Sequence, residues 1–310
     1  MSAEAVSRPR PVRSPVRESG IGLAYALAAF GAWGVNPIYF KALRSVPPLE
    51  IVAHRVIWSV LVVAALVHAG NRWRELKAVL ASGSGRAVFA ASTVLISINW
   101  LVFIWATNNN RLLEASLGYF LTPLVNVVLG VAFLRERLTR VQIAAVALAA
   151  LGVLNQVIAL GSFPWISLAL AFSFGTYGLL RKRVAADSTV GLFIETTLLI
   201  PIALGYVAYL WSIGAGAFGH GPATRDALLV ASGAVTAFPL LWFVAGARRL
   251  KLATVGLLQY VSPSIQFVLA VALYGEHFTA AHALTFASIW VSLALYSASA
   301  LSASRQPGAI

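Results

Sequence analysis

The chain has 310 residues, of which 59% are hydrophobic and only 11% are charged. Soluble proteins carry roughly a quarter charged residues, so this composition excludes an ordinary water-soluble surface and predicts an all-α integral membrane protein. The chain has no cysteine, which excludes disulfides, thiolate nucleophiles and cysteine-based metal sites, and we expect neither a metal nor a cofactor.

Apolar runs of about 20 residues, the length that crosses a bilayer, organise the chain. Reading from the N-terminus, we predict ten spanning helices at residues 20–43, 48–69, 86–108, 112–134, 139–158, 164–181, 188–210, 226–247, 252–274 and 279–301. Residues 1–19 are rich in Arg, Pro and Ser and lack the cleavage site of a signal peptide, which predicts a disordered basic cytoplasmic tail. Residues 302–310 form a second cytoplasmic tail.

Lysine and arginine are unevenly placed around these runs. With a cytoplasmic N-terminus, 18 of the 23 basic residues lie in cytoplasmic segments, four lie outside and one, Arg55, lies within a span. Such a bias orients membrane proteins, so both termini are predicted to be cytoplasmic. The bias also accounts for the net charge of +13. We therefore expect membrane lipids as partners and no nucleic acid.

The fourth run has a second copy 140 residues later. Residues 120–139 and 260–279 are identical at seven of twenty positions, including Pro123 with Pro263 and Glu136 with Glu276. A weaker match relates residues 30–34 to 174–178. The sequence thus predicts two repeats of five helices, at residues 20–158 and 164–301. Because five is odd, the second repeat enters the membrane inverted, as in many secondary transporters.

Few ionisable residues lie inside the predicted spans. Arg55 and His54 lie about 10 Å from the outer end of the second span, and Glu195 lies at a similar depth from the inner end of the seventh. A charge at the centre of a helix costs about 2.5–3.5 kcal/mol on insertion, so each is a functional candidate. Arg55 is predicted to attract an anionic substrate group, and Glu195 and His54 are candidates for proton coupling. The structural alternatives are an ion pair, a snorkelling Arg55 and a hydrogen-bonded His54.

Further polar residues cluster where the fourth span begins. Glu114, Ser116 and Tyr119 precede Pro123, and Tyr260 precedes Pro263 in the second copy. Proline within a span frees a backbone carbonyl, which favours a cavity where the two halves face each other. The alternatives are packing kinks at the prolines and a Glu114 that only complements its helix dipole. Two residues of the third span, Asn99 and Trp100, complete the predicted substrate-binding set.

Four stretches of the sequence are distinctive enough to indicate a relationship to a known family. They are Glu50–Ser59 (EIVAHRVIWS), Asn99–Ala106 (NWLVFIWA), Leu113–Phe120 (LEASLGYF) and Gln259–Tyr260. With them the chain resembles the EamA group of the drug/metabolite transporter superfamily, from Gly22 to about Ser297. The resemblance implies a ten-helix permease of two EamA halves in the bacterial cytoplasmic (inner) membrane. It also implies export of a small molecule such as an amino acid, another metabolite or an amphenicol.

Two classes of function compete at this point. A secondary transporter explains the duplication and the buried charges, and the chain has no Walker motif, so a proton gradient or exchange would supply the energy. An intramembrane enzyme would show paired Asp, Ser with His, or HExxH within spans, and none is present. A non-transporting scaffold would not need Arg55 and Glu195. The sequence leaves a homodimer open.

Overall fold

The computed structural model describes residues 15–134, 138–161, 163–184, 186–250 and 252–304, and all regular structure in those ranges is helical. Glu136, half of the glutamate pair in the repeat, lies outside them. The helices are α1 (Pro15–Ala42), α2 (Pro48–Ala69), α3 (Trp73–Ala81), α4 (Gly83–Asn108), α5 (Leu112–Leu134), α6 (Arg140–Leu160), α7 (Trp165–Lys182), α8 (Ser188–Ser212), α9 (Ala223–Ala247), α10 (Leu252–Leu258), α11 (Val261–Val268), the π-helix η1 (Leu269–Leu273) and α12 (Ala280–Ser304).

Nine candidate membrane spans occur in the described part of the chain. The helix α7 is not among them, because its last turn is Arg181-Lys182 and these charges lower its mean hydropathy. The total of ten spans therefore stays a prediction. The bounds of α2 and α5 are those predicted, whereas α3 is an additional short amphipathic helix between the second and third predicted spans.

The span predicted at 252–274 corresponds to the candidate span Thr254–Leu273, but three helical segments form it in place of one continuous helix. The helix α10 ends at Leu258, and α11 begins again at Val261. Pro263 explains the break. It has no N–H to donate to the carbonyl of Gln259, four residues earlier, and its ring clashes with that carbonyl. After α11 the backbone passes into the π-helix η1 and then turns at Gly275, whose φ is +63°.

Glu276 follows this turn and connects the segment after η1 to the start of α5. Its Oε1 accepts a hydrogen bond from the backbone N–H of Leu112 and its Oε2 from that of Leu113, each at 2.8 Å. Both N–H groups are free because α5 begins there, and a carboxylate at a helix N-terminus also complements the helix dipole. Glu276 therefore caps α5 from a segment more than 160 residues away.

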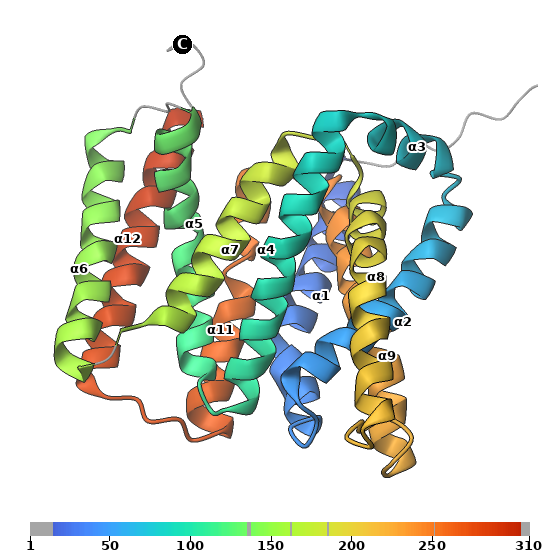
Figure 1. The fold of residues 1–310 in the computed structure, drawn as a ribbon. Coiled ribbons are helices and arrows are strands. Elements are labelled where there is room, and N and C mark those ends of the chain that lie inside the picture. Colours follow the sequence, from blue (N-terminus) through green and yellow to red (C-terminus); the bar gives the residue numbers. More distant parts are fainter. Residues whose placement is uncertain (1–14, 135–137, 162, 185, 251, 305–310) are drawn as a thin grey trace, which may run out of the picture.

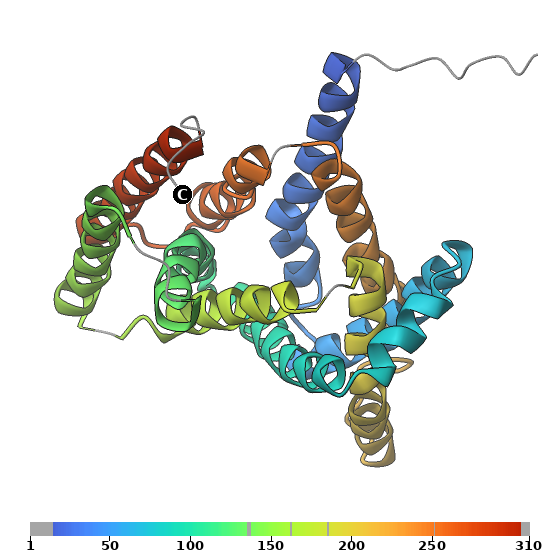
Figure 2. The same ribbon diagram turned by 90° about the horizontal axis from the view of Figure 1, so that it is seen from above.

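Most of the packing joins helices before residue 161 to helices after it. The extensive contacts are α5 with α7, α6 with α12, α2 with α8 and α9, α1 with α9 and α11, and α4 with α7. Figure 1 shows α6 and α12 side by side at one edge and α2, α8 and α9 at the other. The start of α1, the end of α12 and α3 lie on one side of the molecule (Figure 1). Figure 2, a view along the helices, shows α4 and α7 crossing the centre.

Gly233 of α9 shows how closely these helices approach. A Cβ added there would lie 2.5 Å from the backbone carbonyl of Trp58 in α2, whereas a Cβ added at Gly205 of α8 would meet nothing within 4 Å. We expect Gly233→Ala to lower the melting temperature in detergent by several degrees, since overpacking costs about 1–3 kcal/mol.

The matched control is Gly205→Ala, which introduces the same side chain into a helix without a clash. It should leave the melting temperature unchanged or raise it, because alanine favours helix over glycine by about 1 kcal/mol. Scanning fluorimetry of the two purified variants makes the comparison. Equal shifts would contradict the close approach of α2 and α9.

Candidate functional site

Arg55 lies in the first half of α2 and contacts helices from both ends of the chain. Its residue is only 8% exposed. Its Nε donates to Thr236 Oγ1 of α9 at 2.9 Å, and its guanidinium carbon lies 4.1 Å from the ring centre of Trp100 in α4. The ring of Phe40 in α1 is 5.7 Å away. The aromatic faces attract the cation and reduce the cost of its burial.

The other end of the guanidinium carries N–H donors that no described residue uses. Among the described residues no carboxylate lies within 4.0 Å of Arg55, and neither terminal Nη atom has a hydrogen-bond partner. Neither Nη atom is among the fully enclosed, unpartnered side-chain atoms. Guanidinium binds carboxylate and phosphate through paired N–H groups. Arg55 is thus held through its Nε and through contact with two aromatic rings, and its Nη donors are left for an anion.

Asn99 and Tyr119 form a polar layer beside this group. The Tyr119 hydroxyl donates to Asn99 Oδ1 at 3.0 Å, and Asn99 Nδ2 donates to the Leu170 carbonyl at 3.2 Å and to Ser173 Oγ at 3.1 Å. These bonds connect α4, α5 and α7. They use both N–H donors of the Asn99 amide, so Asn99 is held in place beside Trp100. The Tyr119 hydroxyl has already donated its proton, so only its oxygen is left to accept a hydrogen bond from a ligand.

Glu195 is completely buried on α8 and has a different partner from the one considered in the sequence. Its Oε1 accepts from Ser92 Oγ of α4 at 2.7 Å, and its Oε2 accepts from the Tyr177 hydroxyl of α7 at 3.3 Å. The cation next to it is Arg181, with Nε 4.0 Å from Oε1. Glu195 therefore has no ion pair with Arg55. Arg181 lies at the end of α7, where a basic residue is explained by the orientation of the protein in the membrane alone.

The positions of these two charges are related by the repeat. Arg55 and Glu195 are separated by 140 residues, which is the offset between the two copies in the sequence. Ser92, which bonds Glu195, and Ser232, which lies on α9 one turn before Thr236, have the same separation. Under the repeat that the sequence predicts, these positions would be equivalent, and they carry a cation and an anion.

His54 precedes Arg55 in the first half of α2 and is buried beside Glu50. Its Nε2 lies 4.0 Å from Glu50 Oε1, its ring lies 4.9 Å from the ring of Phe218, and neither ring nitrogen has a hydrogen bond. The alternative of a hydrogen-bonded His54 is therefore wrong. Glu50 Oε1 accepts from the backbone N–H groups of Ala217 at 2.6 Å and Phe218 at 3.4 Å, so this pair fastens the loop between α8 and α9.

The remaining predicted residues lie along α5 and α11. Glu114 pairs with Arg111 at 2.8 Å, in line with its simpler interpretation, and the Ser116 hydroxyl donates to the Leu113 carbonyl of its own helix. Tyr260 stacks on Phe120, with ring centres 6.3 Å apart, and Pro263 is buried in α11. The structure thus brings Phe120 of α5 into contact with Tyr260, whereas Glu114 and Ser116 are not among the residues that contact Arg55 in α1, α4 and α9.

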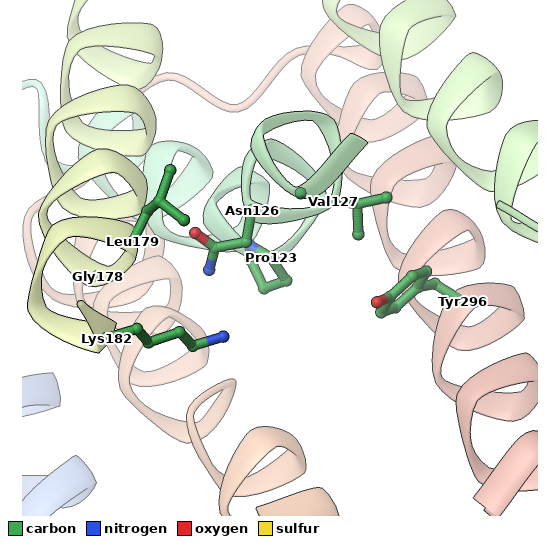
Figure 3. Close-up of a pocket in the computed structure, with 8 residues that line it drawn as sticks. Pro123, Asn126, Val127, Gly178, Leu179, Lys182 and Tyr296 are labelled. Carbon is green, nitrogen blue, oxygen red and sulfur yellow. The ribbon is translucent and has the colours of Figure 1, made fainter. Parts of the chain in front are cut away.

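A cavity of about 190 Å³ opens between α5, α7 and α12. Figure 3 shows the polar ends of Lys182, Asn126 and Tyr296 directed into it, with Pro123 at its wall. Lys182 was missed in the sequence for the same reason as Arg181, its position among the basic residues at the end of α7. The cavity is lined by neither Arg55 nor Glu195, so we regard the buried groups around Arg55 as the candidate site.

Comparison with known proteins agrees with this architecture. The model of the EamA-like transporter family matches residues 20–156. An uncharacterized transporter of Vibrio cholerae is 46% identical over 282 residues, which cover 91% of this chain and 93% of that protein. Protein RarD of Escherichia coli K12 is 47% identical over 275 residues, or 89% of this chain and 93% of that protein.

A solved crystal structure covers 91% of this chain and 98% of its own, with a TM-score of 0.55 and 20% identity, and it shows a likeness of fold alone. The sequence relatives carry the assignment, because their identity extends over almost the whole length of both proteins. The resemblance inferred from the sequence is confirmed: the chain belongs to the EamA-like transporter family and is a multi-pass membrane transporter.

Proposed function

We propose that the protein is a secondary active transporter that exports a small anionic or zwitterionic molecule across the bacterial inner membrane by alternating access. The observation that carries the proposal is Arg55, buried between helices from both ends of the chain, with no carboxylate partner among the described residues and Nη donors unused. A structural arginine at this depth would be expected to have a carboxylate partner. Arg55 is suited to receive that carboxylate from a substrate.

The packing of the helices supports two inverted five-helix repeats with cytoplasmic ends. The repeat equates α1 with α7, α2 with α8, α4 with α9, α5 with the α10–η1 segment, and α6 with α12. The most extensive contacts between unlike helices then have counterparts: α5 with α7 matches α11 with α1, α2 with α9 matches α8 with α4, and α1 with α9 matches α7 with α4. The pairs α2–α8, α5–α11 and α6–α12 are self-matching. Such a pseudo-twofold relation lets the halves exchange conformations about a central site.

Glu195 supplies a means of proton coupling in this scheme. As a carboxylate it accepts hydrogen bonds from α4 and α7 and attracts Arg181, so it holds these helices to α8. Protonation removes the negative charge that Arg181 faces and converts one carboxylate oxygen into a donor. The contacts of Glu195 with α7 of its own half and with α4 of the other half are thereby weakened, which couples binding of a proton to separation of α4 from α8.

The proposal is tested with purified protein in proteoliposomes. A panel of amino acids, other metabolites and amphenicols is first screened for a rise in melting temperature, since a ligand that binds only the folded protein stabilises it. Flux of any stabilising compound is then followed with and without a pH gradient. Saturable flux that responds to the gradient is the expected result. Ligand binding without flux under either condition would refute secondary transport.

A further inference from the structure

A second cavity, of about 270 Å³, lies between the ends of α2 and α9 and the start of α8. It is on the side of the molecule that carries α3 (Figure 1). Three arginines line it, Arg72, Arg248 and Arg249, against a single carboxylate, that of Asp187. Because the basic side chains outnumber the acidic one, the cavity has a positive potential and favours an anion.

The carboxylate of Asp187 occupies this cluster in a specific way. Its Oδ2 lies 2.7 Å from Nη1 of Arg72 and also 2.7 Å from Nη2 of Arg248. Its Oδ1 accepts from the Thr189 N–H at 2.9 Å and so caps α8. Burial alone would raise the pKa of Asp187, but the Thr189 N–H and the Arg72 charge outweigh it and lower that pKa. Asp187 thus presents a carboxylate to two arginines that come from different halves of the chain.

The cavity lies on the same face of α2 as Arg55. It reaches Leu66, which stands eleven residues beyond Arg55, about three turns and 16 Å along the helix. The hydroxyl of Ser59, one turn from Arg55 on that side, is buried and has no hydrogen-bond partner. A polar group without a partner inside a span is costly, unless a passing ligand or water pairs with it. Leu66 of the cavity, Ser59 and Arg55 thus lie along one face of α2.

We propose that this cavity is an entry site for the anionic group of a small water-soluble substrate. When no such group is bound, the Asp187 carboxylate pairs with the arginines in its place. An arriving carboxylate or phosphate competes with Asp187 for Arg72 and Arg248. After loss of the Arg72–Asp187 bond, Glu75 still pairs with Arg72 at 3.5 Å and still accepts from the Asp187 N–H, so α3 stays attached to the segment before α8. The identity of the ligand as the substrate rests on the proposed function, whereas the anion site itself does not.

The test uses the absence of cysteine from the chain, which makes a single introduced thiol free of background. Ala245 lines the cavity, and Ala245→Cys is reacted in detergent with two methanethiosulfonates of similar size, the anionic ethylsulfonate and the cationic ethyltrimethylammonium. We expect the anionic reagent to react faster. Asp187→Asn should increase the anionic-to-cationic rate ratio about fivefold, and Arg72→Gln should reduce it by a similar factor.

Two features make this experiment decisive. Asparagine retains the oxygen that caps α8, so Asp187→Asn removes the charge without removing the cap. The control is Val141→Cys at the start of α6, which is exposed and lies at the opposite edge of the molecule (Figure 1). Its ratio should not change in either variant. A ratio at position 245 that is unaffected by Asp187→Asn would overturn the anion site.

The source of the anion is distinguished in further arms. Glutamate or inorganic phosphate should slow modification of the thiol at position 245, whereas in nanodiscs the change from zwitterionic to anionic lipid should have no effect. Protection by anionic lipid without protection by either soluble anion would overturn the proposed entry site in favour of a lipid headgroup. None of these measurements requires transport, so failure of the proposed function would leave their outcome unchanged.

Discussion

Replacement of Arg55 by alanine is expected to abolish transport while the protein still inserts and folds. Among the buried groups around Arg55, the guanidinium is the one that we assign to the substrate anion. Truncating one member of a buried charge pair costs about 2–5 kcal/mol of binding free energy. The efficiency of transport should therefore fall by about 100-fold or more. Initial rates in proteoliposomes over a range of substrate concentrations give this number, and thermal unfolding verifies the fold.

Three companion variants separate substrate binding from packing. Arg55→Lys retains the charge but loses the planar pair of donors, so it should restore part of the affinity and not all of it. Thr236→Val removes the hydrogen bond that holds Nε and should weaken binding less than Arg55→Ala does. Arg44→Ala changes an exposed arginine and should transport normally. Full transport by Arg55→Ala would eliminate the proposed anchor.

Replacement of Glu195 by glutamine is expected to remove the dependence of transport on a pH gradient. Glutamine retains hydrogen-bonding capacity toward Ser92 and Tyr177 but has no titratable charge for Arg181 to face. Uphill accumulation should therefore disappear, while exchange of labelled for unlabelled substrate continues. Parallel measurements of accumulation and exchange in the same vesicles show the difference.

Asp226→Asn is a suitable control, since Asp226 lies at the start of α9 and accepts a hydrogen bond from the N–H of Gly219. It is a carboxylate that the coupling scheme does not use, so its variant should accumulate substrate in response to the gradient. If Glu195→Gln accumulated substrate as the original protein does, another group would carry the proton. His54, whose ring nitrogens have no hydrogen bonds, would be the next to test.

Much of the helical architecture was predictable, because a spanning helix is encoded locally by a long apolar run. The bounds of α2 and α5 were predicted to the residue. The nine-residue α3 was missed, since a short segment with alternating charged and apolar residues has the composition of a loop. The break before α11 was also missed, although Pro263 was visible, because proline is tolerated in spanning helices and Pro123 leaves α5 continuous.

The candidate site was predictable only in part. Arg55 and Glu195 stood out because ionisable residues are rare in apolar runs. Their partners did not, since Thr236 is 181 residues from Arg55 and has no unusual chemistry. Arg181 was hidden by its position at the end of α7, where a basic residue already has an explanation. Whether such a side chain points to water or folds back along Phe89, 4.6 Å from that ring, depends on tertiary packing.

The interleaved packing has a consequence for how the protein is made. The helix α2 enters the bilayer about 140 residues before α8 and still earlier than α9, so Arg55 is inserted before Thr236 has been synthesised. Until then the arginine faces lipid and must reach toward the headgroups. The helices before residue 161 thus depend on later helices to complete their packing. A chain that stops near residue 161 would leave the surfaces of α2, α5 and α6 uncovered.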